Sequence, residues 1–154
     1  MRRKDQRGLT LVELIVAFTI MALLTAMAVP MARYKVRRDR ERDLRYALRE
    51  IRGAIDKYKD IADRGMLGTL SVDAQGYPES LDMLVQGVKL AGSVDKKIRF
   101  LRRIPRDPIT NSYEWGLRSM QDDPTSTSWG GQNVFDAYTK STEKAADGTA
   151  YSDW

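Results

Sequence analysis

The residues best suited to chemistry lie near the start of the chain, where Gly8 precedes an apolar run that contains one carboxylate, Glu13. Glycine lets the backbone extend without side-chain obstruction. A carboxylate inside a membrane helix costs roughly 2.5–3.5 kcal/mol at the helix centre and less near an end. Glu13 therefore either lies at the membrane surface without a role or is compensated by a partner charge.

The apolar run is long enough to span a bilayer. From Leu9 to Ala32 it contains 24 residues, which form about 36 Å of helix against a hydrocarbon core of about 30 Å. The basic leader MRRKDQR precedes it, and the sequence AMAVP near its end leads into a helical pattern without a break. This is not the pattern of a cleaved secretory signal, so we expect the segment to be kept as a membrane anchor.

Beyond the apolar run, hydrophobic residues recur every three or four positions, which predicts one apolar stripe on a helix. They are Leu44, Ala47, Leu48, Ile51, Ile55, Tyr58 and Ala62. We expect a helix over residues 9–63, with a kink near Pro30 because proline lacks a backbone donor, and an end at Gly65 and Gly68. Such a stripe must pack against further structure.

The rest of the chain predicts a small α+β domain on this stripe. A short helix is expected to start with Ser80 or Glu79 near its cap. Alternating apolar and polar residues at 112–118 and 133–139 predict two antiparallel strands. The linker of residues 121–131 is rich in serine and threonine, and its sequence assigns it no role.

Composition favours a structural subunit over an enzyme. The 154 residues include neither histidine nor cysteine, which removes the usual general base, thiol catalysis and zinc sites. No disulfide can hold the C-terminal loops, and no phosphate-binding loop is present in the sequence. Acid–base catalysis by paired carboxylates remains open, but no motif supports it.

The basic residues are concentrated just after the apolar run. The net charge of +5 becomes +2 without the first eight residues, which hold four basic side chains and one acidic one. The remaining basic excess lies in residues 33–45. We interpret this segment as a solvated helix face with arginine–acid pairs that can also meet anionic lipid head groups, and nucleic-acid binding is the alternative. By charge count alone, the positive-inside rule would place the C-terminal side in the cytoplasm.

The sequence Gly8-Leu9-Thr10-Leu11-Val12-Glu13 resembles the prepilin peptidase site of type IV pilins and type II secretion pseudopilins. The resemblance implies cleavage after Gly8 and N-methylation of Leu9, where the family more often has phenylalanine. It also implies that Glu13 of one subunit neutralises the Leu9 amine of its neighbour in a filament, a pairing that sets register. Pilin-like helices characteristically carry a proline at the place of Pro30, which adds it to the residues expected to act in assembly.

The later part of the chain has the order of features found in major pseudopilins. These are Tyr77-Pro78, the turn Pro105-Arg106-Asp107-Pro108, the aromatic strand at 113–117, Phe135-Asp136 and the final Trp154. On these motifs the chain is similar to the major pseudopilins of type II secretion systems, within the type IV pilin-like superfamily. The resemblance implies a long N-terminal helix packed against a small antiparallel sheet, in an α+β pilin-like fold.

This resemblance also implies a division of the chain and a location. Residues 1–8 are expected to be a cleaved leader, residues 9–32 the transmembrane and filament-core half of the helix, and residues 33–154 a periplasmic domain that includes the amphipathic half. The protein is expected to cross the bacterial inner membrane once, with its N-terminus in the cytoplasm, which is the opposite of the orientation given by charge count.

The implied function is that of a structural subunit of a periplasmic pseudopilus that drives protein secretion. The implied partners are further copies in a homo-oligomeric filament, minor pseudopilins, prepilin peptidase, an inner-membrane assembly platform with a cytoplasmic ATPase, and membrane lipid before assembly; nucleic acid is not expected. Two alternatives stay open: a type IV pilin used for adhesion, motility or DNA uptake, and a single-span membrane protein whose basic helix binds DNA or lipid.

The last loop contains oxygen ligands suited to a hard cation. Calcium prefers about six to eight oxygens, and Asp147, Asp153 and Ser141 can supply some of them. From the residues alone, an ordinary Asp-Gly turn with solvated acids is the alternative. Because major pseudopilins bind calcium in this loop, the resemblance implies a calcium site here, although residues 144–146 replace the family's acidic, glycine-rich tract.

Overall fold

The structure is a computed structural model that describes residues 10–93 and 96–154. The chain divides into two compact units, Met1–Asp39 and Arg40–Trp154. We describe each unit by itself, and the predicted segment boundary between residues 32 and 33 stays a prediction.

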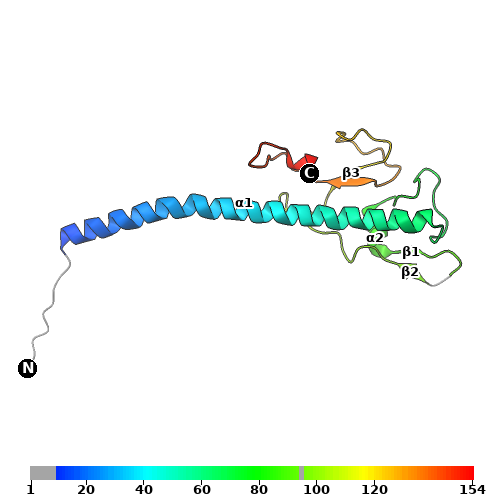
Figure 1. The fold of residues 1–154 in the computed structure, drawn as a ribbon, viewed down its shortest axis with the longest axis horizontal. Coiled ribbons are helices and arrows are strands. Elements are labelled where there is room, and N and C mark those ends of the chain that lie inside the picture. The colour runs from blue at the N-terminus through cyan, green and yellow to red at the C-terminus, as the bar shows by residue number, and fades with distance from the viewer. Residues whose placement is uncertain (1–9, 94–95) are drawn as a thin grey trace, which may run out of the picture. The chain divides into compact units, whose positions relative to one another are not determined.

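Helix α1, Leu11–Asp63, belongs to both units and is continuous through Pro30 (Figure 1). It ends at the predicted place in a Schellman motif, in which the N–H of Met66 donates to the carbonyl of Ile61 at 3.2 Å and that of Gly65 to Ala62 at 2.9 Å. The φ of Gly65 is 65°, a conformation that glycine adopts without strain. The helix end is therefore determined by residues next to it in the sequence.

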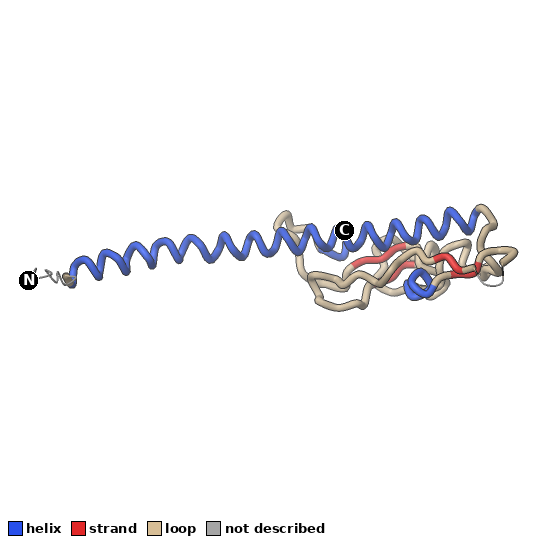
Figure 2. Tube along the Cα trace, turned by 90° about the horizontal axis from the view of Figure 1, so that it is seen from below, coloured by secondary structure: helices blue, strands red, loops and turns tan. Residues whose placement is uncertain are grey.

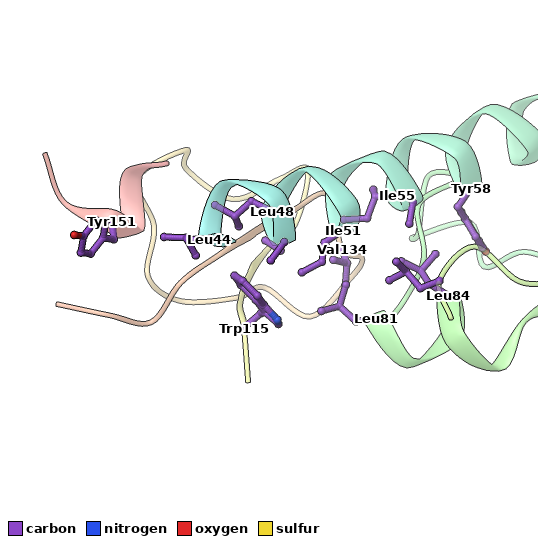
Figure 3. Close-up of a cluster of buried hydrophobic side chains, with 14 of the residues drawn as sticks. Leu44, Leu48, Ile51, Ile55, Tyr58, Leu81, Leu84, Trp115, Val134 and Tyr151 are labelled. Carbon is purple, nitrogen blue, oxygen red and sulfur yellow. The ribbon is translucent and has the colours of Figure 1, made fainter. Parts of the chain in front are cut away.

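Within the second unit, strands and loops lie along one side of α1 (Figure 2). Every residue of the predicted apolar stripe is buried, together with Ala54. Helix α2, Leu81–Gln86, follows Ser80, whose Oγ accepts the N–H of Met83 at 3.3 Å and caps the helix as predicted. Figure 3 shows Leu81 and Val134 facing the stripe, so elements distant in sequence close one core.

The strands form two small antiparallel pairs. β3 (Gly116–Arg118) pairs with β4 (Asp136–Tyr138), inside the two predicted strand regions but shorter than either. β1 (Val88–Lys89) pairs with β2 (Lys97–Ile98), and the sequence analysis did not predict this pair. The α+β fold with a long N-terminal helix and small antiparallel sheets is confirmed.

Charged side chains fasten β3 and β4 to α1. Asp136 accepts from the Nε of Arg52 at 2.7 Å and lies 3.5 Å from the Nη1 of Arg118. The guanidinium of Arg118 in turn stacks over the Tyr138 ring, with its Cζ 4.0 Å from the ring centroid. On β3, Gly116 lies so close to this ring that a Cβ there would be 2.3 Å from the Tyr138 Cζ.

Candidate functional site

The start of α1 is organised around Glu13. The Oγ1 of Thr10 accepts the N–H of Glu13 at 3.3 Å, which makes Thr10 the N-cap and puts Glu13 at the third helical position. A carboxylate in the first turn also favours the positive end of the helix dipole. The sequence analysis missed this cap, although Thr-x-x-Glu before an apolar run is the pattern of a capping box.

Residues 11–36 form what we call the exposed apolar segment. Its large hydrophobic side chains are all exposed: Leu11, Val12, Leu14, Ile15, Val16, Phe18, Ile20, Met21, Leu23, Leu24, Met27, Val29, Met31, Tyr34 and Val36. Apolar surface that surrounds a helix needs lipid or partner helices to cover it. α1 is long and apolar enough to cross a membrane at this segment.

Glu13 is the one charged side chain between residues 11 and 32. The two hydroxyls in that range are satisfied locally, since the Oγ1 of Thr19 donates to the carbonyl of Ile15 and that of Thr25 to Met21, both at 2.8 Å. A threonine bonded in this way hides its polar group from hydrocarbon. The carboxylate of Glu13 is therefore the group in this range that needs a partner from outside the segment.

The basic residues that follow lie on an exposed helical surface. The guanidinium of Arg38 lies 5.7 Å from the ring centroid of Tyr34, and Arg42 pairs with Asp43 at 3.6 Å. Exposed pairs of this kind contribute little to stability, about 0–1 kcal/mol. The geometry agrees with the interpretation of a solvated face.

Comparisons with known proteins point to the same N-terminal segment. Residues 3–29 match the family model described as the prokaryotic N-terminal methylation motif. Over 121 residues the chain is 29% identical to the type II secretion system core protein G of Klebsiella michiganensis, an alignment that covers 74% of this chain and 75% of the relative. The chain thus carries the methylation motif at its N-terminus and is similar along most of its length to a type II secretion core protein. The relative is a core protein of a secretion system, which supports a structural subunit rather than an enzyme, and no solved structure matches the chain.

The predicted processing site, Gly8 and Leu9, lies outside the described residues, although the matched motif covers both positions. Glu13 and Pro30 are described, on the same exposed helical segment. The roles of these four residues in cleavage, methylation and assembly stay predictions.

In the C-terminal loop, Asp147 closes a tight turn. Its Oδ1 accepts from the Oγ1 of Thr149 at 2.7 Å and from the Thr149 N–H at 3.0 Å. These two bonds, the hydroxyl first, hold the pKa of the Asp147 carboxyl below its ordinary value. Gly148 has a φ of 88°, which suits the Asp-Gly turn that was the alternative to a metal site.

The other two predicted calcium ligands are also engaged locally. The Ser141 Oγ accepts the N–H of Glu143 at 3.1 Å, and the Ser152 hydroxyl donates to Asp153 at 3.5 Å. In residues 10–93 and 96–154, no group of three or more Asp, Glu, His or Cys side chains could hold a metal ion, and no hydrogen bond joins Asp147, Asp153 and Ser141. A hard cation needs converging oxygens, and in this arrangement the three side chains do not converge, so calcium binding in this loop stays a prediction.

A buried carboxylate that the sequence analysis overlooked organises the Pro-x-Asp-Pro turn. Asp107 is fully buried, and its Oδ1 accepts the N–H of Ile109 at 2.8 Å. Its Oδ2 accepts from the hydroxyl of Thr139 at 2.5 Å, just after β4. The Asp-Pro sequence predicted a turn, but the burial of its carboxylate depends on a residue 32 positions away.

The serine- and threonine-rich loop is closed by two further side chains. The Oδ2 of Asp122 accepts the N–H groups of Ser119 at 2.7 Å and Gly130 at 3.0 Å. These two bonds, the Ser119 one first, lower the pKa of the Asp122 carboxyl. The buried Asn133 accepts the Met120 N–H at 3.0 Å. This loop is ordered by polar bonds at its neck, and no functional role follows from them.

Proposed function

We propose that this chain is a pseudopilin, a structural subunit of a periplasmic pseudopilus that drives type II protein secretion. The proposal rests mainly on the exposed apolar segment. Its single carboxylate, Glu13, lies in the first turn of α1 and within the matched methylation motif. The similarity to a type II secretion core protein along most of both chains supports the choice of secretion over a type IV pilus.

The proposed assembly step uses the Leu9 amine and the Glu13 carboxylate. Prepilin peptidase would cleave after Gly8, leaving Leu9 as a methylated, positively charged terminus. Each charge is costly in an apolar filament core, so pairing Glu13 of one subunit with Leu9 of its neighbour lowers the cost for both and sets the axial register. Thr10 supports this step indirectly, because the cap fixes the first turn on which Glu13 stands.

The proposed location is the bacterial inner membrane, crossed once with the N-terminus in the cytoplasm, where the leader meets the peptidase. Further copies and minor pseudopilins would extend the filament from an inner-membrane platform. A cytoplasmic ATPase would supply the energy, because the sequence contains no phosphate-binding loop. Before assembly, lipid would cover the exposed apolar segment, with the basic residues after it at the head groups.

Two variants of Glu13 test whether its charge or its place in the helix cap matters. Glu13→Gln keeps a side-chain oxygen at the third helical position but removes the charge, and Glu13→Val removes both. With prepilin peptidase and the assembly proteins co-expressed, we expect both variants to lose residues 1–8 and gain one methyl group by intact mass. We expect neither to form filaments by electron microscopy.

Thr10→Val is the matched control, because it weakens the cap by about 1 kcal/mol and keeps the Glu13 charge. We expect this variant to form filaments. Filaments from Glu13→Gln together with none from Thr10→Val would make helix capping the role of Glu13 and exclude the pairing. Cleavage at any bond other than the one after Gly8 would contradict the proposed processing.

A further inference from the structure

The last residues of the chain are attached to α1 by two aromatic side chains. The hydroxyl of Tyr151 donates to the Oε1 of Glu41 at 2.8 Å, and Tyr151 as a whole is 1% exposed. The guanidinium of Arg45, one helical turn after Glu41, lies over the Trp154 ring with its Cζ 4.1 Å from the centroid. Tyr151 and Trp154 contact each other edge to face, with ring centroids 4.9 Å apart. We call these four residues the C-terminal clip.

The clip joins the hydrophobic core at one end. Figure 3 shows Tyr151 at the Leu44 end of the buried stripe. Aromatic side chains bury large areas, and an edge-to-face pair adds about 0.5–1.5 kcal/mol to that burial. The segment is thus held by packing of the same kind as the rest of the domain.

The clip also explains how the Asp147 turn is held. The Nε1 of Trp154 donates to the Oγ1 of Thr149 at 3.1 Å, and the same hydroxyl donates to Asp147 at 2.7 Å. Thr149 also donates its N–H to Asp147, and its carbonyl accepts the N–H of Ala145 at 2.8 Å. Asp147 is therefore the end of a hydrogen-bond chain that starts at Trp154.

Arg45 brings positive charge to this loop. It stacks on Trp154, and it also acts on Asp147 as a minor cause of the lowered pKa of that carboxyl, after the Thr149 bonds. A divalent cation in a pseudopilin loop would have the same two effects, since it would neutralise carboxylates and join the loop to itself. In this chain Arg45 of α1 supplies positive charge near Asp147, and the hydrogen bonds of Thr149 join the loop to itself.

We propose that the C-terminal clip holds residues 141–154 on α1 without calcium, with Arg45 supplying the positive charge that a cation would otherwise bring. This inference concerns the stability of one subunit and does not depend on the proposed secretion function. It differs from the expectation that the family resemblance gave for this loop.

Amide hydrogen exchange of the full chain in detergent micelles tests the inference. We expect residues 141–154 to show the same protection in calcium chloride and in the chelator EDTA. Arg45→Gln should lower that protection by about threefold to tenfold, because a cation–π contact is lost. Lys57→Gln is the matched control, since Lys57 is exposed on α1 about three helical turns further on and should leave the protection unchanged.

Asp147→Asn separates the clip from a metal site. Asparagine keeps the oxygen that accepts from Thr149 but removes the charge that calcium needs, so we expect protection like that of the natural protein in both solutions. Loss of protection in EDTA, reproduced in calcium chloride by Asp147→Asn, would overturn the inference in favour of calcium. Equal protection in Arg45→Gln and the natural protein would overturn the role of Arg45.

Discussion

The two halves of α1 are both rich in apolar residues, but only one is covered by its own chain. From Leu44 to Ala62 the apolar side chains keep to one stripe, and that stripe is buried by α2, β3, β4 and their loops. In the exposed apolar segment, hydrophobic side chains occupy every face. A domain that packs on one side can cover a stripe, but a helix that is apolar all round needs a surrounding medium. The spacing of the apolar residues, more than their number, decides which half of α1 can be covered by the rest of its own chain.

The largest effect is expected from one substitution made in each half. Ile51 is 0% exposed and Ile15 is 57% exposed. Ile51→Ala should lower the free energy of unfolding of the second unit by about 2–5 kcal/mol, because it leaves a cavity in the core. Ile15→Ala should change the same quantity by less than about 0.5 kcal/mol.

Urea unfolding of the full chain in micelles, followed by tryptophan fluorescence, measures both changes. The probe suits the comparison, because all three tryptophans lie in the second unit. Similar losses from the two substitutions would mean that the exposed apolar segment contributes to the core, and the contrast between the halves would be wrong.

A smaller effect is expected at the boundary between the halves, from Arg33→Gln combined with Lys35→Gln. Each charge near an anionic surface contributes about 1 kcal/mol, so the double variant should retain anionic lipid about thirtyfold less well than the natural protein. Native mass spectrometry from micelles with equal anionic and zwitterionic lipid measures the retention. Arg102→Gln with Arg103→Gln is the control, since both residues are exposed in the second unit. Equal losses from both pairs would exclude a specific role for the segment after the anchor.

The smallest effect is expected from Asp122, whose hydrogen bonds close the neck of the serine- and threonine-rich loop in the second unit. The pKa of Asp122 is lowered from 3.8, so its stabilisation of the loop neck is present above about that pH and is lost as the pH falls through the folded value. The amide NMR signals of Ser119 and Gly130 should shift together in that acidic range. In Asp122→Asn this shared titration should be absent. If it persists in the variant, another group closes the neck.

Local sequence signals predicted the features that depend on neighbouring residues. The end of α1 at Gly65, the cap at Ser80 and the antiparallel partners in 112–118 and 133–139 all follow from short-range rules. β1 and β2 were missed because two residues are too few to show alternation.

Features that depend on distant residues were not predictable in the same way. The ion pair of Arg52 with Asp136 joins positions 84 apart, and no local pattern indicates it. The calcium expectation came from resemblance of the last loop and could not take account of Arg45, which lies on α1 about a hundred residues earlier in the sequence. Glu13 was identified from its motif. The N-cap residue Thr10 was missed, although the Thr-x-x-Glu capping pattern indicates it.

Because Gly116 contacts the Tyr138 ring, the residue at each of these two positions limits which residues the other can accept. Gly116 is not among the glycines with positive φ, so its backbone would accept other residues. The obstacle is the Tyr138 ring, which occupies the space of a Cβ and also supports Arg118. Position 116 can therefore enlarge in a lineage only after position 138 has become smaller, and that step removes the surface on which Arg118 stacks. The Tyr138 ring therefore constrains the order in which positions 116, 118 and 138 can be substituted.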